Sequence, residues 1–110
     1  MPVRRIVKIS KYHNVKTVLD GITFDSRAEA RRYSELVLLK RAGEISTFGC
    51  QPSLVVAPGI RYVADFICIG KDGKVWLEDV KGVETQAFRL KRKLYDAAYP
   101  GIELRIIKGR

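Results

Sequence analysis

The sequence predicts an α/β protein in which a mixed β-sheet is covered by helices on both faces and is preceded by a short β-hairpin. Three observations support this class. A chain of 110 residues is long enough for one domain with a substantial core and too short for two. Its patterns follow the order hairpin, helix, three strands, helix, strand. The central strands are apolar on both faces, as expected of a sheet without a solvated side.

Composition and charge narrow the choice of partner. Hydrophobic residues make up 46% of the chain and charged residues 30%, which is ordinary for a soluble globular protein. Lys and Arg outnumber Asp and Glu by 21 to 12, so the net charge is +9. This excess predicts a polyanionic partner, with nucleic acid favoured over a membrane surface because the sequence has no long apolar span and no basic amphipathic helix. A basic surface that only maintains solubility is the alternative.

The two cysteines indicate the compartment. Cys50 and Cys68 form neither a CxxC motif nor a zinc-site spacing with the single histidine, His13. No signal peptide is recognisable at the start of the chain. We therefore expect a reduced, cytoplasmic protein with two buried thiols.

Residues 1–14 precede the predicted domain, which we place at residues 15–110. The segment fits either a basic arm that lies on nucleic-acid phosphates or a loosely ordered terminus. Its basic residues are Arg4, Arg5, Lys8 and Lys11.

A β-hairpin is predicted at the start of the domain. Val15 to Leu19 and Ile22 to Phe24 have strand character and flank Asp20-Gly21. This dipeptide favours a tight two-residue turn, because glycine accepts a positive φ.

The first helix is predicted over residues 26–42, with Gly43 as its end. Two interpretations of Glu29 remain open. Ser26 and Glu29 have the spacing of a capping box, which would make Glu29 a structural residue. Glu29 also begins a stripe at positions i, i+4 and i+7, which would turn its carboxylate towards the sheet and a functional site.

Three strands are predicted next, over residues 52–57, 60–69 and 74–81. Pro58-Gly59 closes the first of them. Gln51, at its entrance, either lines a site or is an ordinary loop amide.

The turn between the last two of these strands decides which residues face each other. A two-residue loop would place Asp65 opposite Val80 and away from Asp79. We predict the three-residue loop Lys71-Asp72-Gly73, with Gly73 in the left-handed position, which places Asp65 directly opposite Asp79. In this register, Asp65 and Asp79 share one face of the sheet with Val63, Ile67, Ile69, Val75 and Leu77. The same register groups Tyr62, Ala64, Phe66, Trp76 and Val80 on the other face.

The second helix is predicted over residues 84–99, with Pro100-Gly101 as its end. Ala87, Leu90, Leu94 and Ala98 line one side. Arg89, Lys91 and Arg92 are candidate nucleic-acid contacts, although Lys91 also fits a solvated lysine. A final strand over residues 102–107 alternates Ile102, Leu104 and Ile106.

The segment from Val75 to Gly82 carries the chemistry. Asp79 and Lys81 project from one face of the strand, because side chains alternate along it. A carboxylate can hold a hard cation such as Mg²⁺, and a lysine can orient the attacking water or offset charge on a phosphate. Asp72-Gly73-Lys74 has the same spacing but lies in a turn. Asp79 differs because its strand is apolar and Asp65 provides a second carboxylate.

Glu29, Asp65 within Tyr62-Val63-Ala64-Asp65-Phe66, and Asp79-Val80-Lys81 together resemble the PD-(D/E)XK nuclease superfamily. The chain is also similar to a small phage- and prophage-encoded family, over most of its length after residue 11. That similarity lies in Phe24-Asp25-Ser26, Glu29-Ala30, Gln51-Pro52, Tyr62 to Phe66, Asp79 to Gly82 and Phe88-Arg89-Leu90-Lys91. Alanine replaces the superfamily's proline before Asp65 and leaves the carboxylate in place.

The resemblance implies a restriction-endonuclease-like core and roles for particular residues. Asp65, Asp79 and the backbone carbonyl of Val80 would bind Mg²⁺ or Mn²⁺. Glu29 would hold a second metal ion or its waters, and Lys81 would be catalytic. The implied activity is endonucleolytic cleavage of DNA, with Holliday junctions or other branched DNA in phage recombination as the expected substrates, in the cytoplasm of a bacterial host.

Two functions of another class remain open. One is a non-catalytic nucleic-acid-binding module that has kept the nuclease fold. The other is a basic adaptor that docks a replication protein. The set Glu29, Asp65, Asp79 and Lys81 favours the enzyme, because clustered carboxylates that face phosphates bring no benefit to a pure binder.

We also expect a homodimer, because symmetrical cleavage of branched DNA needs two sites in a fixed relation. An apolar surface on the first helix and the segment after it is the predicted interface. It comprises Val37, Leu38, Ile45 and Phe48.

Overall fold

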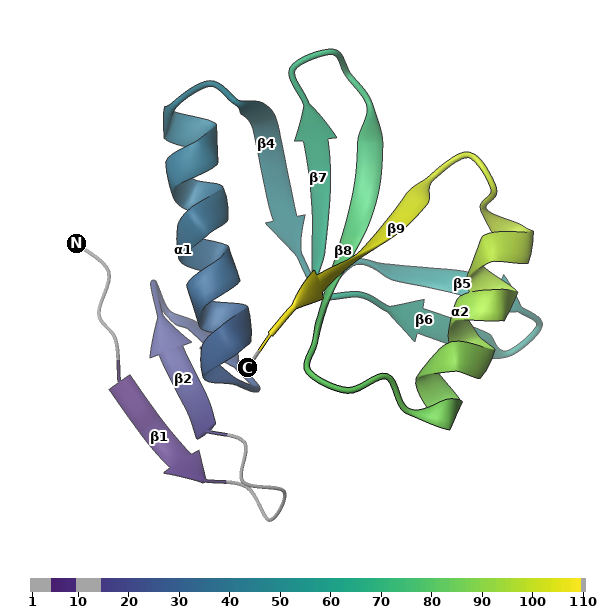
Figure 1. The fold of residues 1–110 in the computed structure, drawn as a ribbon, viewed down its shortest axis with the longest axis horizontal. Helices are drawn as coiled ribbons and strands as arrows, with labels where there is room; N and C mark the ends of the chain where they lie inside the picture. The colour runs from purple at the N-terminus through teal and green to yellow at the C-terminus, as the bar shows by residue number, and fades with distance from the viewer. Residues whose placement is uncertain (1–4, 10–14, 110) are drawn as a thin grey trace. The chain divides into compact units, whose positions relative to one another are not determined.

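The computed structural model describes residues 5–9 and 15–109, and the chain divides into two units, Met1–Leu38 and Leu39–Arg110 (Figure 1). The predicted α/β class is confirmed: the described residues form two helices, a mixed sheet and the expected hairpin. Within these residues, neither helix is long and apolar enough to cross a membrane.

The N-terminal unit contains a three-stranded antiparallel sheet in the order β1-β2-β3. β2 (Val15–Leu19) and β3 (Ile22–Phe24) form the predicted hairpin, and Asp20 and Gly21 in its turn have φ values of 54° and 77°. β1 (Arg5–Ile9) was not predicted as a strand. It gives Arg5 and Lys8 a place in the sheet, whereas Arg4 and Lys11 lie outside the described residues.

Helix α1 (Arg27–Arg41) has the predicted extent. Its first turn is capped by Ser26, whose Oγ accepts a hydrogen bond from the Glu29 N–H at 3.2 Å. Gly43 follows the helix with a φ of 78°, a left-handed conformation that glycine adopts without strain. Sequence patterns at both ends of the helix were therefore correct.

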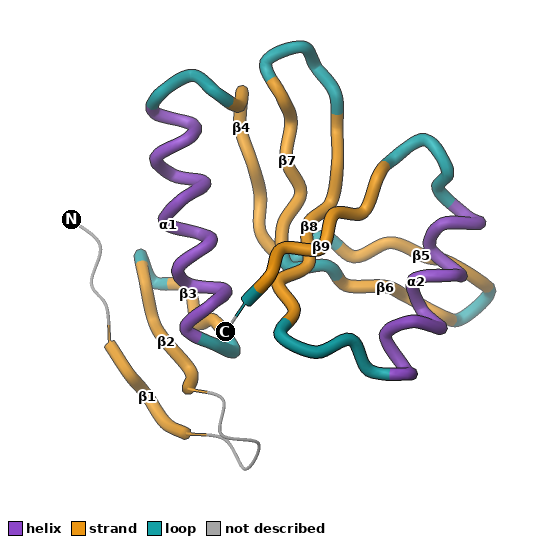
Figure 2. Tube along the Cα trace, viewed as in Figure 1, coloured by secondary structure: helices purple, strands orange, loops and turns teal. Residues whose placement is uncertain are grey.

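The C-terminal unit contains a four-stranded mixed sheet in the order β4-β7-β8-β9 (Figure 2). β7 (Phe66–Gly70) pairs antiparallel with β4 (Ile45–Cys50) and with β8 (Val75–Lys81). β9 (Glu103–Lys108) pairs parallel with β8 after the intervening helix. β4 was not predicted, because an irregularity between Ile45 and Thr47 interrupts the alternation that identifies a strand.

β5 (Ser53–Ala57) and β6 (Ile60–Val63) form a separate two-stranded sheet, so the prediction of one continuous strand over residues 60–69 was wrong. The chain changes pairing partners at Ala64. The Ala64 N–H donates to the Pro52 carbonyl, and the next N–H, of Asp65, donates to the Glu78 carbonyl.

This change of partners also alters the predicted faces. Tyr62 and Ala64 lie in the core cluster with Leu77, on the aspartate face rather than opposite it, and Val63 is 57% exposed. Phe66, Cys68, Trp76 and Val80 keep the predicted alternation and are buried.

Helix α2 (Gln86–Ala98) begins after Thr85, whose side chain accepts a hydrogen bond from the Phe88 N–H at 3.1 Å. Its buried residues are Phe88 and Tyr95, which pack with Leu77 and Leu104 of the sheet. The predicted apolar side was wrong, since Leu90 is 62% exposed. Two aromatic rings bury more apolar surface than a stripe of alanine and leucine, and they decide which side of the helix faces inward.

Some of the four residues predicted to form a dimer surface are buried. Ile45 is buried, and Phe48 is half-buried with its ring edge-on to Phe66 at 6.4 Å between centroids. Leu38 is exposed and Val37 is half-buried. The four residues therefore do not form one exposed apolar patch.

Candidate functional site

The predicted three-residue turn between β7 and β8 is present. The Gly70 N–H donates to the Lys74 carbonyl at 2.8 Å, and Gly73 has a φ of 87°. Phe66 pairs with Glu78 and Ile67 with Leu77. One further step in this antiparallel register brings Asp65 opposite Asp79, as the sequence predicted.

Each aspartate side chain accepts a hydrogen bond from the backbone of the segment opposite it. The Asp65 N–H donates to Asp79 Oδ1 at 3.2 Å, and the Val80 N–H donates to Asp65 Oδ2 at 2.7 Å. These bonds fix both carboxylates at the point where β7 begins. The result is a pre-organised pair of oxygen ligands rather than two freely rotating side chains.

Asp79 is almost completely buried, at 2% exposure. Burial raises its pKa to about 6, against the lowering effects of the Lys81 charge and the hydrogen bond from the Asp65 N–H. Its Oδ2 atom is buried and has no hydrogen-bond partner among the described residues. A buried carboxylate oxygen of this kind needs a proton, a water molecule or a cation.

The donor set fits a small hard cation. Asp65 and Asp79 supply carboxylates. Val80 supplies its carbonyl on the same strand edge, because the N–H and C=O of one strand residue point to the same side. In the part of the chain that the structure describes, no three His, Cys, Asp or Glu side chains group into a metal site. Mg²⁺ fits such a set, since it is commonly bound by one or two carboxylates with water and phosphate oxygens as its other ligands.

Lys81 lies two residues after Asp79 on β8 and therefore on the same face. Its ammonium lies 4.7 Å from the centroid of the Phe88 ring in α2, a cation–π contact that restrains the end of a long side chain. Phe88 was not predicted as a site residue. The only sequence signal for it was its place in the matched segment Phe88-Arg89-Leu90-Lys91.

Gln51 is adjacent to the aspartate pair. Its N–H donates to the Asp65 carbonyl at 2.9 Å, and its backbone has a φ of 54°. Non-glycine residues rarely adopt this conformation, and those that do are concentrated at functional sites. The Gln51 side chain is exposed, so the structure brings this predicted residue to the site with its amide accessible.

Glu29 lies in the N-terminal unit, in the first turn of α1. Its N–H and its Oε2 both contact Ser26 Oγ, at 3.2 Å and 3.4 Å. The Ser26 half of the capping box is therefore present, and the Glu29 carboxylate contacts the Ser26 hydroxyl. A role for Glu29 in a metal site stays a prediction.

The basic residues of α2 are accessible to solvent. Arg89 and Lys91 are exposed, whereas Arg92 is half-buried and lies 3.9 Å from Asp96 in an ion pair. Arg89 and Lys91 therefore keep their charges available for a polyanion.

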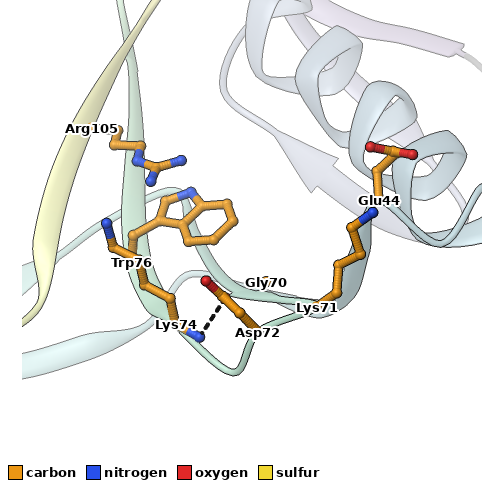
Figure 3. Close-up of a pocket in the computed structure, with 7 residues that line it drawn as sticks. All are labelled: Glu44, Gly70, Lys71, Asp72, Lys74, Trp76 and Arg105. Carbon is orange, nitrogen blue, oxygen red and sulfur yellow. Dashed lines mark hydrogen bonds between the residues drawn. The ribbon is translucent and has the colours of Figure 1, made fainter.

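A separate cavity of about 610 Å³ lies at the turn end of β7 and β8 (Figure 3). The Trp76 ring forms its centre, with the Arg105 guanidinium 4.0 Å from the ring centroid. Trp76 projects from the opposite face of β8 to Asp79. The cavity is lined by Lys71, Lys74 and Arg105 but also by Glu44 and Asp72, so it has little excess charge to hold an anion.

The profile of a protein family described as "Protein of unknown function (DUF1064)" matches residues 9–110. A comparison with curated proteins finds no match.

Proposed function

The chain belongs to the DUF1064 family of proteins of unknown function, and from its site geometry we propose that it is a Mg²⁺- or Mn²⁺-dependent nuclease that hydrolyses DNA phosphodiesters. One observation carries the proposal. A nearly fully buried aspartate, Asp79, has an Oδ2 with no hydrogen-bond partner in the part of the chain that the structure describes, and it is held beside a second aspartate with Lys81 on the same face. Such an arrangement is costly for folding and is useful for binding a cation.

Each residue has a defined task in the proposed reaction. Asp65, Asp79 and the Val80 carbonyl would hold the cation, which would supply charge stabilisation for the phosphate and make an attacking water more acidic. Lys81 places its ammonium beside the phosphate and offsets the negative charge that grows during attack. The water oxygen forms the new bond to phosphorus, and the bond to the departing sugar oxygen breaks.

We further propose that the chain has a restriction-endonuclease-like core. The antiparallel β7–β8 pair followed by the parallel β8–α2–β9 connection supports this. The natural substrate would be branched DNA, including Holliday junctions, in the phage or prophage setting that the sequence resemblance implies. Glu29 would hold a second metal ion or its waters, as the sequence resemblance implies.

A non-catalytic nucleic-acid-binding module is the alternative, and the buried aspartate disfavours it. Binding to phosphates requires cations such as Arg89 and Lys91, which are exposed on α2. An ionised Asp79 would oppose that binding. A module that only bound DNA would gain from an uncharged residue at this position.

Cleavage assays with matched variants test the proposal. Purified protein is incubated with labelled linear duplex, single-stranded, flapped and four-way DNA in Mg²⁺, Mn²⁺ or chelator. Asp79→Asn and Lys81→Ala should each slow cleavage by about 100-fold or more and leave DNA affinity within a few fold, because phosphate contacts elsewhere supply most of the binding.

The chain contains its own control for this experiment. Asp72 and Lys74 have the same spacing as Asp79 and Lys81 but lie at the turn, away from Asp65. Asp72→Asn and Lys74→Ala should cleave at nearly the parent rate. The proposal is wrong if the parent shows no metal-dependent cleavage of any DNA or RNA, or if Asp79→Asn and Lys81→Ala are as active as these controls.

A further inference from the structure

The β5–β6 hairpin begins and ends at the aspartate pair. Gln51 precedes it and Asp65 follows it, and two backbone hydrogen bonds close its base, from Gln51 to Asp65 at 2.9 Å and from Ala64 to Pro52 at 3.1 Å. Figure 2 shows the hairpin projecting away from the four-stranded sheet and running beside α2. Anything bound at Asp65 and Asp79 is therefore next to the base of this hairpin.

One side of the hairpin is used for folding. Val56 and Tyr62 pack in the core cluster with Phe88 and Tyr95 of α2. Tyr99 adds a hydrogen bond from its hydroxyl to the Val55 carbonyl at 2.8 Å. These contacts fix the hairpin as a rigid projection, so it can hold a bound molecule in a defined position.

The other side of the hairpin is exposed and carries Val55 and Val63, which are 46% and 57% exposed and lie beside Ser53 and Arg61. Ile60, at the tip, is 40% exposed. These are three of the six large apolar side chains found exposed in the described residues. The tip, Pro58 to Ile60, is exposed at every position. Such a surface is typical of a contact site rather than of a side that folding requires.

The charge of the hairpin favours nucleic acid over a second copy of the chain. Residues 52–63 contain no Asp or Glu, and their one charged residue, Arg61, is exposed with Nη1 3.4 Å from Ser53 Oγ. The whole chain carries +9, which attracts a polyanion. Apolar tips flanked by cations are also the type of element that proteins insert between base steps.

We propose that the β5–β6 hairpin is a nucleic-acid-binding arm in which Arg61 contacts a phosphate and the Pro58–Ile60 tip packs against an interrupted base stack. The placement of the reacting phosphate at Asp65 rests on the proposed nuclease function. Ile60 is five residues from Asp65, or about 17 Å at about 3.4 Å per strand residue. This span corresponds to roughly five nucleotides of a stacked strand. The arm would therefore favour DNA whose stack is broken about five nucleotides from the cut.

Binding measured without cleavage tests this arm. Fluorescence anisotropy in chelator gives the affinity of the full chain for four-way and linear duplex DNA at several salt concentrations. Arg61→Gln should weaken binding to both DNAs and lower the salt slope by about 0.9, the value for one lost phosphate contact. Arg61→Lys, which keeps the charge, should restore the slope. Lys71→Gln, at the far end of β7, removes the same charge and should leave the slope within error.

The tip is tested by Ile60→Ser against Leu38→Ser, which changes an exposed leucine of α1. Ile60→Ser should reduce the preference for four-way over linear DNA by about tenfold and leave the salt slope unchanged, because it removes an apolar contact with an open base step. Leu38→Ser should keep the preference. A fluorescent base analogue placed at the open base step of the four-way junction should brighten on binding the parent and not Ile60→Ser.

Three results would overturn the proposal that the β5–β6 hairpin is a nucleic-acid-binding arm. The first is a parent that binds no nucleic acid. The second is a parent that binds DNA while Arg61→Gln and Ile60→Ser match it in affinity, slope and preference. The third is a parent dimer that Ile60→Ser dissociates with DNA affinity intact, which would make the hairpin a protein contact. None of these readouts needs cleavage, so the arm and the nuclease activity can fail separately.

Discussion

At the scale of single residues, Asp79 links stability to pH. Its pKa is raised by burial to about 6 in the folded protein, from 3.8 for an unperturbed aspartate. Between these values the folded state holds more protons than the unfolded state, so the free energy of unfolding falls as pH rises. The loss is nearly complete above about pH 7, where the buried carboxylate is ionised.

Asp79→Asn should remove this loss. We predict that the variant is more stable than the parent above pH 7, by up to about 3 kcal/mol for a shift of two pKa units, and that the difference disappears near pH 4. Urea unfolding at a series of pH values measures it. Asp72→Asn, at an exposed aspartate, is the control. Parallel pH profiles for parent and Asp79→Asn would mean that Asp79 is not a strained carboxylate.

Cation binding should restore the free energy of unfolding that is lost when Asp79 ionises. A cation at Asp79 competes with the proton, so Mg²⁺ or Mn²⁺ should raise the melting temperature more at pH 7.5 than at pH 5. Thermal unfolding with and without chelator provides the measurement. The shift should be absent in Asp79→Asn and retained in Asp72→Asn. Equal shifts in all three proteins would assign the effect to general ion binding.

Two variants distinguish a role of Glu29 in the helix cap from a role in the proposed site. Ser26→Ala removes the acceptor for the Glu29 N–H and should cost about 1 kcal/mol of stability. Glu29→Gln keeps a residue that can serve a capping box, so its stability should stay close to that of the parent. If Glu29 holds metal or water, Glu29→Gln will nevertheless cleave far more slowly. A fully active Glu29→Gln would limit the residue to the helix cap.

At the scale of elements, the β7–β8 turn sets the site. Gly73 has a φ of 87°, a conformation in which side chains are strained, and a Cβ there would meet nothing within 4 Å. The cost of a substitution is therefore conformational rather than steric. A change in this turn alters the register that brings Asp65 opposite Asp79.

Gly73→Ala should destabilise the protein by about 1–2 kcal/mol, and Gly73→Asn should recover part of this because asparagine tolerates the left-handed region. Chemical unfolding measures both. Gly101→Ala is the matched control, since its Cβ would also meet no atom within 4 Å and its φ is not left-handed. Equal stabilities for Gly73→Ala and Gly101→Ala would show that the turn is not constrained as described.

At the scale of the whole molecule, the proposed nuclease activity sets a requirement on assembly. One site cuts one strand in each encounter, so opposed cuts in a four-way junction require two copies in a fixed relation. A two-fold dimer provides this most simply. The surface first predicted for it is unsuitable, because Ile45 is buried and Phe48 packs on Phe66.

We predict a homodimer on junction DNA at micromolar concentration, held through a surface other than the predicted one. Sedimentation velocity with and without the junction measures the mass, and end-labelled strands show whether cuts are opposed. Linear duplex should be cut less readily. A monomer under both conditions would leave a general nicking nuclease.

Local sequence signals determined several features of this protein by themselves. The Asp20-Gly21 turn, the ends of both helices and the three-residue β7–β8 loop were correct, because each depends on the backbone preferences of neighbouring residues. The loop alone fixes the register of its two strands. The facing of Asp65 and Asp79 could therefore be predicted without any long-range information.

Tertiary structure decided what depends on partners distant in the sequence. The split of residues 60–69 into β6 and β7 follows from competing strand partners, which no local pattern reveals. The inward side of α2 follows from where Phe88 and Tyr95 find a core. The raised pKa of Asp79 and the contact of Lys81 with Phe88 exist only after these elements pack. Burial and long-range pairing are properties of the assembled chain, and together they made an aspartate in a strand into a candidate cation ligand.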